Sequence, residues 1–165
     1  MPVSHDLDRA EIEQRYLELS KLTHPDRFVG GSSSERRAAM ERSTAVNVAY
    51  RTLRDPVSRV EYLVKLGGID LDSSDPDGGA PKPDQAFLMD MIERREKVDE
   101  ARQQGPDAVD DMRIAVEDEL DEVFEQAVSK IEDEDIVGAA HCLVTHRYLR
   151  RLLGELEETM ELANL

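Results

Sequence analysis

The 165-residue chain has one cysteine, no tryptophan and no long apolar run. The single Cys142 excludes an intramolecular disulfide and a cysteine-cluster zinc site, and it fits a reducing compartment. Aromatic residues make up only 4% of the chain, which favours helices over the aromatic-rich strands of sheets. Because no stretch of about 18 apolar residues is present, we predict no membrane-spanning helix.

The start of the chain lacks the basic and apolar regions of a secretory signal peptide. Asp6 and Asp8 also argue against a mitochondrial presequence, because such presequences are poor in acidic residues. These absences predict a bacterial-type cytoplasmic protein with no membrane partner.

Negative charge is in excess, and it is unevenly distributed. The net charge is −16, yet residues 1–68 carry 11 basic and 10 acidic side chains, whereas residues 69–165 carry 10 basic and 27 acidic ones. Phosphate repulsion therefore excludes nucleic-acid binding by the C-terminal part. The asymmetry predicts two units with different partners.

Residues 67–84 are rich in glycine, proline, serine and aspartate, and we expect no helix or strand there. We therefore predict a linker over 67–84 between two helical domains, residues 1–66 and residues 85–165. Neither domain shows an internal repeat or a strand pattern.

The N-terminal part predicts three helices, over residues 8–23, 34–54 and 56–66. Asp8 is a suitable N-cap for the first helix, and Glu11 stands three residues later, the spacing of a capping box. Pro25 ends this helix because proline disfavours the helical conformation of the residue before it. The side chains expected to face inward are Ile12, Tyr16, Leu19, Val46, Ala49, Tyr50 and Leu53.

The C-terminal part predicts three longer helices, over residues 84–103, 107–131 and 135–163. Gly105 and Pro106 separate the first two. We predict a break near Asp133–Asp135 from helix length, because an unbroken helix over 107–163 would be far longer than helices usually are. Three amphipathic helices with short connections predict an antiparallel bundle, so the expected fold class is all-α.

The tripeptide His24-Pro25-Asp26 lies between the first two predicted helices. Proline forces His24 away from the helix end, so the imidazole and the Asp26 carboxylate are expected to project into solvent. There they could grip a backbone or an arginine of a partner. Taken alone, the tripeptide is better explained as a turn that stops a helix.

The surrounding residues resemble a J domain, the module with which co-chaperones stimulate ATP hydrolysis by DnaK-type chaperones. Tyr16 precedes the tripeptide, which begins the phrase HPDRF. The phrases AYRTLRDP and RVEYL follow in that order. The segment FLMDMIERREKVDEA at 87–101 is similar to the HscB family of J-domain co-chaperones of iron–sulfur cluster assembly. The resemblance covers about residues 8–163.

This resemblance implies a co-chaperone that is not itself an enzyme and holds no cofactor. It would stimulate a DnaK-type chaperone of the HscA kind through His24, Pro25, Asp26, Arg15, Lys21 and Arg27. Glu11, Glu13 and Glu18 reduce the positive charge of the first helix. Weak binding to general chaperones is therefore expected, which fits a dedicated chaperone partner.

The resemblance also implies that the C-terminal bundle binds an iron–sulfur scaffold protein of the IscU type. The positions that match this role are Leu88, Met89, Ile92, Glu93, Glu96 and Tyr148. Leu88, Ile92 and Glu96 are one turn apart on one ridge of a helix, whereas Phe87 and Met91 form a ridge that could face the core. Without the resemblance, the pattern favours a core position for all four apolar residues. The alternative is a general J-domain co-chaperone, or a helical interaction protein, with no iron–sulfur role.

Other functions are weaker readings of the sequence. Cys142 and His146 share a helix face, but His141 points elsewhere and no further ligand is near, so we expect no metal site. His24 and Asp26 have no nucleophile beside them in sequence, which argues against catalysis. The acidic stretches 117–122 and 132–135 read as a solvated surface, with a basic partner as the alternative.

J domains of this family open with a short apolar helix, and only Met1-Pro2-Val3 aligns with the end of it. We therefore expect the J domain of this chain to be less stable than the bundle, and the natural start to lie further upstream.

Overall fold

The computed structural model describes residues 5–163, and every regular element in that range is a helix, which confirms the all-α class. Residues 1–4 and 164–165 lie outside it, and so does the Met1–Val3 segment discussed above. Contacts divide the chain into two compact units, Met1–Leu63 and Val64–Leu165. No helix in the described range is both long and apolar enough to cross a membrane.

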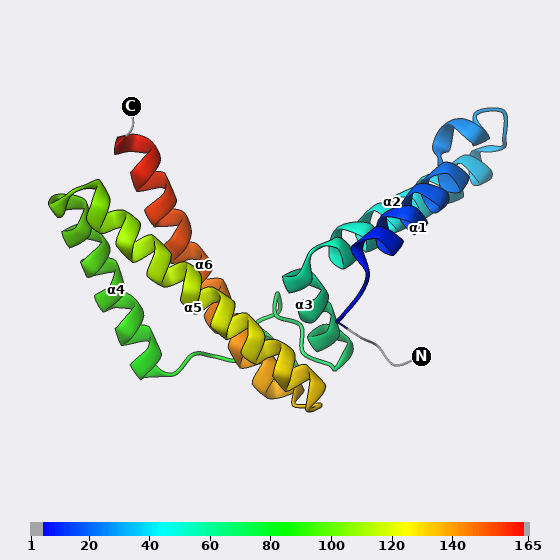
Figure 1. Cartoon of the computed structure of the whole chain (residues 1–165). Helices are drawn as coiled ribbons and strands as arrows, with labels where there is room; N and C mark the ends of the chain where they lie inside the picture. The colour runs from blue at the N-terminus through cyan, green and yellow to red at the C-terminus, as the bar shows by residue number, and fades with distance from the viewer. Residues whose placement is uncertain (1–4, 164–165) are drawn as a thin grey trace. The chain divides into compact units, whose positions relative to one another are not determined.

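The first unit is built on a helical hairpin (Figure 1). Helices α1 (Arg9–Thr23) and α2 (Ser33–Arg54) lie side by side, joined through a 3-10 helix, η1 (Pro25–Phe28). The rings of Tyr16 and Tyr50 stack across the hairpin with their centroids 3.9 Å apart. The hydroxyl of Tyr16 donates a hydrogen bond to Asn47, and the hydroxyl of Tyr50 donates one to Glu13. Aromatic and polar contacts therefore hold the two helices together.

Side-chain caps fix the ends of these helices. As predicted, Asp8 caps α1, its carboxylate accepting a hydrogen bond from the backbone N–H of Ala10. The predicted capping box is wrong, because the Glu11 carboxylate instead accepts hydrogen bonds from Arg15, one turn later. A capping box does form at the start of α2, where Ser32 and Glu35 each bond to the other's backbone N–H.

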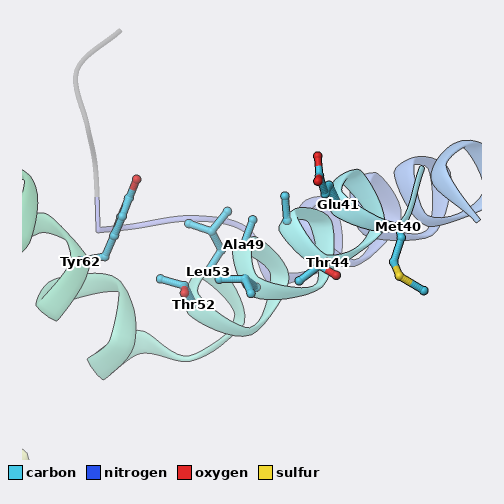
Figure 2. A pocket seen from close by; sticks show the side chains of 9 residues that line it. Met40, Glu41, Thr44, Ala49, Thr52, Leu53 and Tyr62 are labelled. Atoms are coloured by element: carbon cyan, nitrogen blue, oxygen red, sulfur yellow. The ribbon is translucent and has the colours of Figure 1, made fainter. Parts of the chain in front are cut away.

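Little of the hairpin is buried. Ala39 is the one buried residue that α1 and α2 have in the described range. The inward placement of Leu19 and Ala49 is wrong: both are exposed, Leu19 at 48%, and both line an open apolar pocket of about 620 Å³ between the two helices. A second apolar pocket, of about 650 Å³, runs along α2, and Figure 2 shows its lining from Met40 to Leu53 with Tyr62 added by the next helix. Both apolar surfaces of the hairpin are therefore open.

Helix α3 (Pro56–Leu66) follows α2 with the predicted bounds, and the second unit then forms a bundle of α4 (Gln85–Gln104), α5 (Pro106–Glu132) and α6 (Ile136–Ala163). Helices α5 and α6 have the most extensive contact, and α4 packs on both. The core holds residues of all three helices: Met91, Val98, Ala101, Val109, Val116, Leu120, Leu149, Leu152, Leu153 and Leu156.

The segment before α4 contains no helix or strand, as predicted, but it is folded onto the second unit. A bridge joins Asp70 to Gly79, and the backbone N–H of Asp70 donates to Gly78 at 2.7 Å. Leu71 is buried, and its carbonyl accepts a hydrogen bond from Arg147 of α6 at 2.9 Å. The segment therefore forms an ordered surface beside α6.

Truncating a core residue of the bundle should be costly. Leu152 is 1% exposed, so we expect Leu152→Ala to lower the free energy of unfolding by about 2–5 kcal/mol. Val137→Ala, on the same helix at 59% exposed, is the matched control and should change it by less than about 0.5 kcal/mol. Chemical denaturation followed by circular dichroism measures both, and equal effects would contradict the assigned core.

Candidate partner-binding sites

The His24 turn is exposed and locally rigid. The backbone of His24 leaves the helical region at φ −58° and ψ 128°, as the following proline requires. Its Nδ1 accepts a hydrogen bond from the backbone N–H of Asp26 at 3.3 Å and lies 3.6 Å from the Asp26 carboxylate. The proton of the neutral imidazole is then on Nε2, which is left as a donor. With the side chains of His24 and Asp26 56% and 84% exposed, the pair is accessible to a partner.

The basic residues predicted beside this turn are also exposed. Arg27 donates a hydrogen bond to the carbonyl oxygen of Lys21 at 3.2 Å, which joins η1 to the last turn of α1. Lys21 and Arg27 therefore lie close to the His24 turn. Arg15 is two turns away and is paired with Glu11 at 2.8 Å, so its charge is partly neutralised within α1.

One ridge of α4 presents large apolar side chains to solvent. Leu88 is 40% exposed, and Met89 and Ile92 are each 51% exposed. On the adjacent ridge Met91 is buried and Phe87 packs against the core, as the spacing predicted. An amphipathic helix usually buries its apolar side chains, so this exposed ridge is available to a partner.

The structure brings Tyr148 of α6 to the start of this ridge. Its ring meets that of Phe87 edge to face, with centroids 5.4 Å apart. Tyr148 is partly buried against the bundle core, and the guanidinium carbon of Arg151 lies 5.7 Å from its ring centroid. Arg151 is not among the residues predicted from the sequence, although its position three residues after Tyr148 on a helix places the two side chains next to each other.

The acidic residues assigned to this surface, Glu93 and Glu96, are both exposed on α4. Between them Arg94 forms ion pairs with Asp90 of α4 and Glu119 of α5. The hydrogen bonds that Arg94 donates to the Glu119 carboxylate raise the pKa of Arg94 above its ordinary value. This network fixes α4 on α5, and so keeps the apolar ridge turned outward.

The residues considered for a metal do not form a ligand set in the described range. The ring of His146 lies against Phe124, and Cys142 is a half-buried free thiol. Burial raises the pKa of Cys142, which makes the thiolate ligand harder to form.

Comparison with known proteins assigns the two units. Residues 1–62 match the model of the DnaJ domain, and residues 83–157 match that of the HSCB C-terminal oligomerisation domain. The chaperone HscB from Vibrio cholerae is similar in structure, with a TM-score of 0.82, 25% identity and coverage of 99% of this chain and 94% of that one.

Human co-chaperone HscB is similar too, with a TM-score of 0.78, 32% identity and coverage of 93% of this chain and 75% of that one. The human relative is a co-chaperone, and a J domain implies an Hsp70-type chaperone as partner. The two domain matches in this order, together with the identity to human HscB, show that the chain belongs to the HscB family, the J-domain co-chaperones of iron–sulfur cluster assembly.

Proposed function

We propose that this co-chaperone delivers an IscU-type iron–sulfur scaffold to an HscA-type chaperone in the bacterial cytoplasm and stimulates ATP hydrolysis by that chaperone. In this proposal residues 1–66 act as the J domain and residues 85–165 bind the scaffold, with residues 67–84 connecting them. His24, Pro25 and Asp26 trigger the ATPase, and Arg15, Lys21 and Arg27 contribute to docking.

The exposed apolar ridge of α4 is the observation that carries this proposal. Leu88, Met89 and Ile92 lie outside the core, and Glu93 and Glu96 flank them. Large apolar side chains in the centre of a surface with a polar rim are typical of protein interfaces. Because this ridge and the His24 turn belong to different units, one chain offers separate sites to two partners.

The alternative is a general J-domain co-chaperone that serves no scaffold. Two experiments together distinguish the proposal from this alternative. One is isothermal titration calorimetry with the purified IscU-type scaffold of the source organism, and the other is an ATPase assay on the HscA-type chaperone. Our proposal expects saturable scaffold binding and faster ATP hydrolysis. Faster hydrolysis without any scaffold binding would favour the alternative.

Truncation of the α4 ridge should weaken scaffold binding. We expect Leu88→Ala and Ile92→Ala each to raise the dissociation constant about tenfold, because a buried apolar anchor contributes roughly 1–2 kcal/mol to an interface. Tyr148→Ala should weaken binding to a similar degree and also lower stability, because Tyr148 packs on the core. Calorimetric titration with the scaffold measures the first effect, and thermal denaturation measures the second.

Ile114→Ala is the matched control for Ile92→Ala. Ile114 is 45% exposed on α5 and is not part of the ridge, so its truncation should leave scaffold affinity unchanged. None of these variants should alter basal stimulation of the chaperone. Equal losses for Ile92→Ala and Ile114→Ala would place the scaffold site elsewhere.

A further inference from the structure

A basic pocket lies beside Tyr148, in the most acidic part of the chain. It has a volume of about 570 Å³ and opens between the segment 71–83 and α6. Its charged lining consists of three cationic side chains, Lys82, Arg147 and Arg151, and one carboxylate, Asp75. Residues 69–165 carry 27 acidic side chains and only 10 basic ones, so a pocket lined by three cations differs in charge from the rest of this part of the chain.

One of these cations builds the wall of the pocket. Arg147 donates a hydrogen bond to the carbonyl oxygen of Leu71 and forms an ion pair with Asp72 at 3.0 Å. Both contacts hold the segment 71–83 against α6. The pocket therefore exists before any ligand arrives, which lowers the entropic cost of binding.

The other two cations are not neutralised. Neither Lys82 nor Arg151 forms an ion pair or a hydrogen bond in the described part of the chain, despite the excess of carboxylates. Arg151 is held over the ring of Tyr148. A guanidinium placed on an aromatic ring keeps N–H donors available for a carboxylate, which it can bind in a bidentate manner. The pocket thus offers positioned donors for an acidic group.

The pocket is continuous with the proposed scaffold surface. Tyr148 lines the pocket and also contacts Phe87, the residue before Leu88. Pro76, Pro81 and Pro83 supply apolar walls on the opposite side. A chain segment that covers the α4 ridge can therefore extend into the pocket without leaving the protein surface.

We propose that this pocket binds an acidic side chain of the scaffold protein, with Arg151 and Lys82 receiving the carboxylate and Tyr148 receiving an adjacent apolar side chain. The inference rests on the proposed function, because it names the chemistry that the scaffold must present at that site. Arg151 then determines specificity: a scaffold that lacks the acidic residue leaves a positioned cation unpaired.

Charge reversal at neighbouring arginines tests this. Arg150→Glu is the control for Arg151→Glu, because both variants change the net charge by the same amount. Arg150 is exposed, does not line the pocket and forms no ion pair in the described range. We expect Arg151→Glu to weaken binding of the IscU-type scaffold about tenfold or more in calorimetric titrations, and Arg150→Glu to weaken it less than about threefold. Arg151→Gln, which retains most of the side chain, should show an intermediate loss. Added salt should weaken binding of the unmodified chain more than binding of the Arg151→Glu variant.

Circular dichroism melts establish that each variant is folded. Equal losses for Arg150→Glu and Arg151→Glu, with the α4 variants still impaired, would overturn the pocket assignment and leave the proposed function standing. If the unmodified chain does not bind the scaffold, the proposed function fails and this inference fails with it.

Discussion

Replacing His24 with glutamine is expected to reduce chaperone ATPase stimulation to the basal rate while the fold remains intact. The imidazole is more than half exposed, and its hydrogen bond is to Asp26, two residues later in the same turn, so the helices do not depend on it. Glutamine retains polarity and length but lacks the ring, whose Nε2 is the group left for a partner. Steady-state phosphate release by the chaperone measures the effect.

His141→Gln is the control for this experiment. It makes the same chemical change at an exposed histidine of α6, far along the chain from the His24 turn. Stimulation should be unaffected by it. A folded His24→Gln variant that still stimulates the chaperone at the normal rate would contradict the role assigned to the turn.

Backbone amides of α1 and α2 are expected to exchange with solvent at least about a hundredfold faster than those of α5 and α6. In the described range the hairpin buries only Ala39, whereas Leu17, Leu19 and Leu22 are about half exposed. The bundle buries leucines and valines from all three of its helices. Each fully buried side chain contributes about 1.5–3 kcal/mol, so even two fewer would produce this ratio.

Hydrogen exchange measured by mass spectrometry, with peptides from each helix compared in one experiment, checks this expectation. Thermal melting should show the same order of stability: the helical signal of the hairpin should be lost before the bundle unfolds. Equal protection of α2 and α6 would mean that the exposed apolar surfaces of the hairpin do not limit its stability.

The helices could be predicted closely because their ends carry local signals. Pro25, the pair Asp55-Pro56 and the pair Gly105-Pro106 each restrict backbone angles within one or two residues, and the observed helices end where they predict. The break before α6 had no such signal. There Glu134 adopts a positive φ of 59°, and the Asp135 carboxylate accepts a hydrogen bond from the N–H of Gly138 at 2.8 Å.

What the sequence could not predict depends on contacts between distant residues. The ion pair of Arg147 with Asp72 and the contact of Tyr148 with Phe87 join residues more than 60 positions apart. No local pattern marks such pairs. The assignment of Glu11 to a capping box failed for a different, local reason, because Arg15, four residues later on α1, binds the same carboxylate. The exposed ridge of α4 could be predicted only with the help of the family resemblance, because its spacing alone favours a core role, and the basic pocket beside it could not be predicted.

The length of α2 determines which end of the first unit a chaperone would contact. Its 22 residues span about 33 Å, with the His24 turn preceding its first turn and Pro56 following its last. A chaperone that docks on the His24 turn therefore meets the end of the hairpin remote from the point where the chain continues into α3.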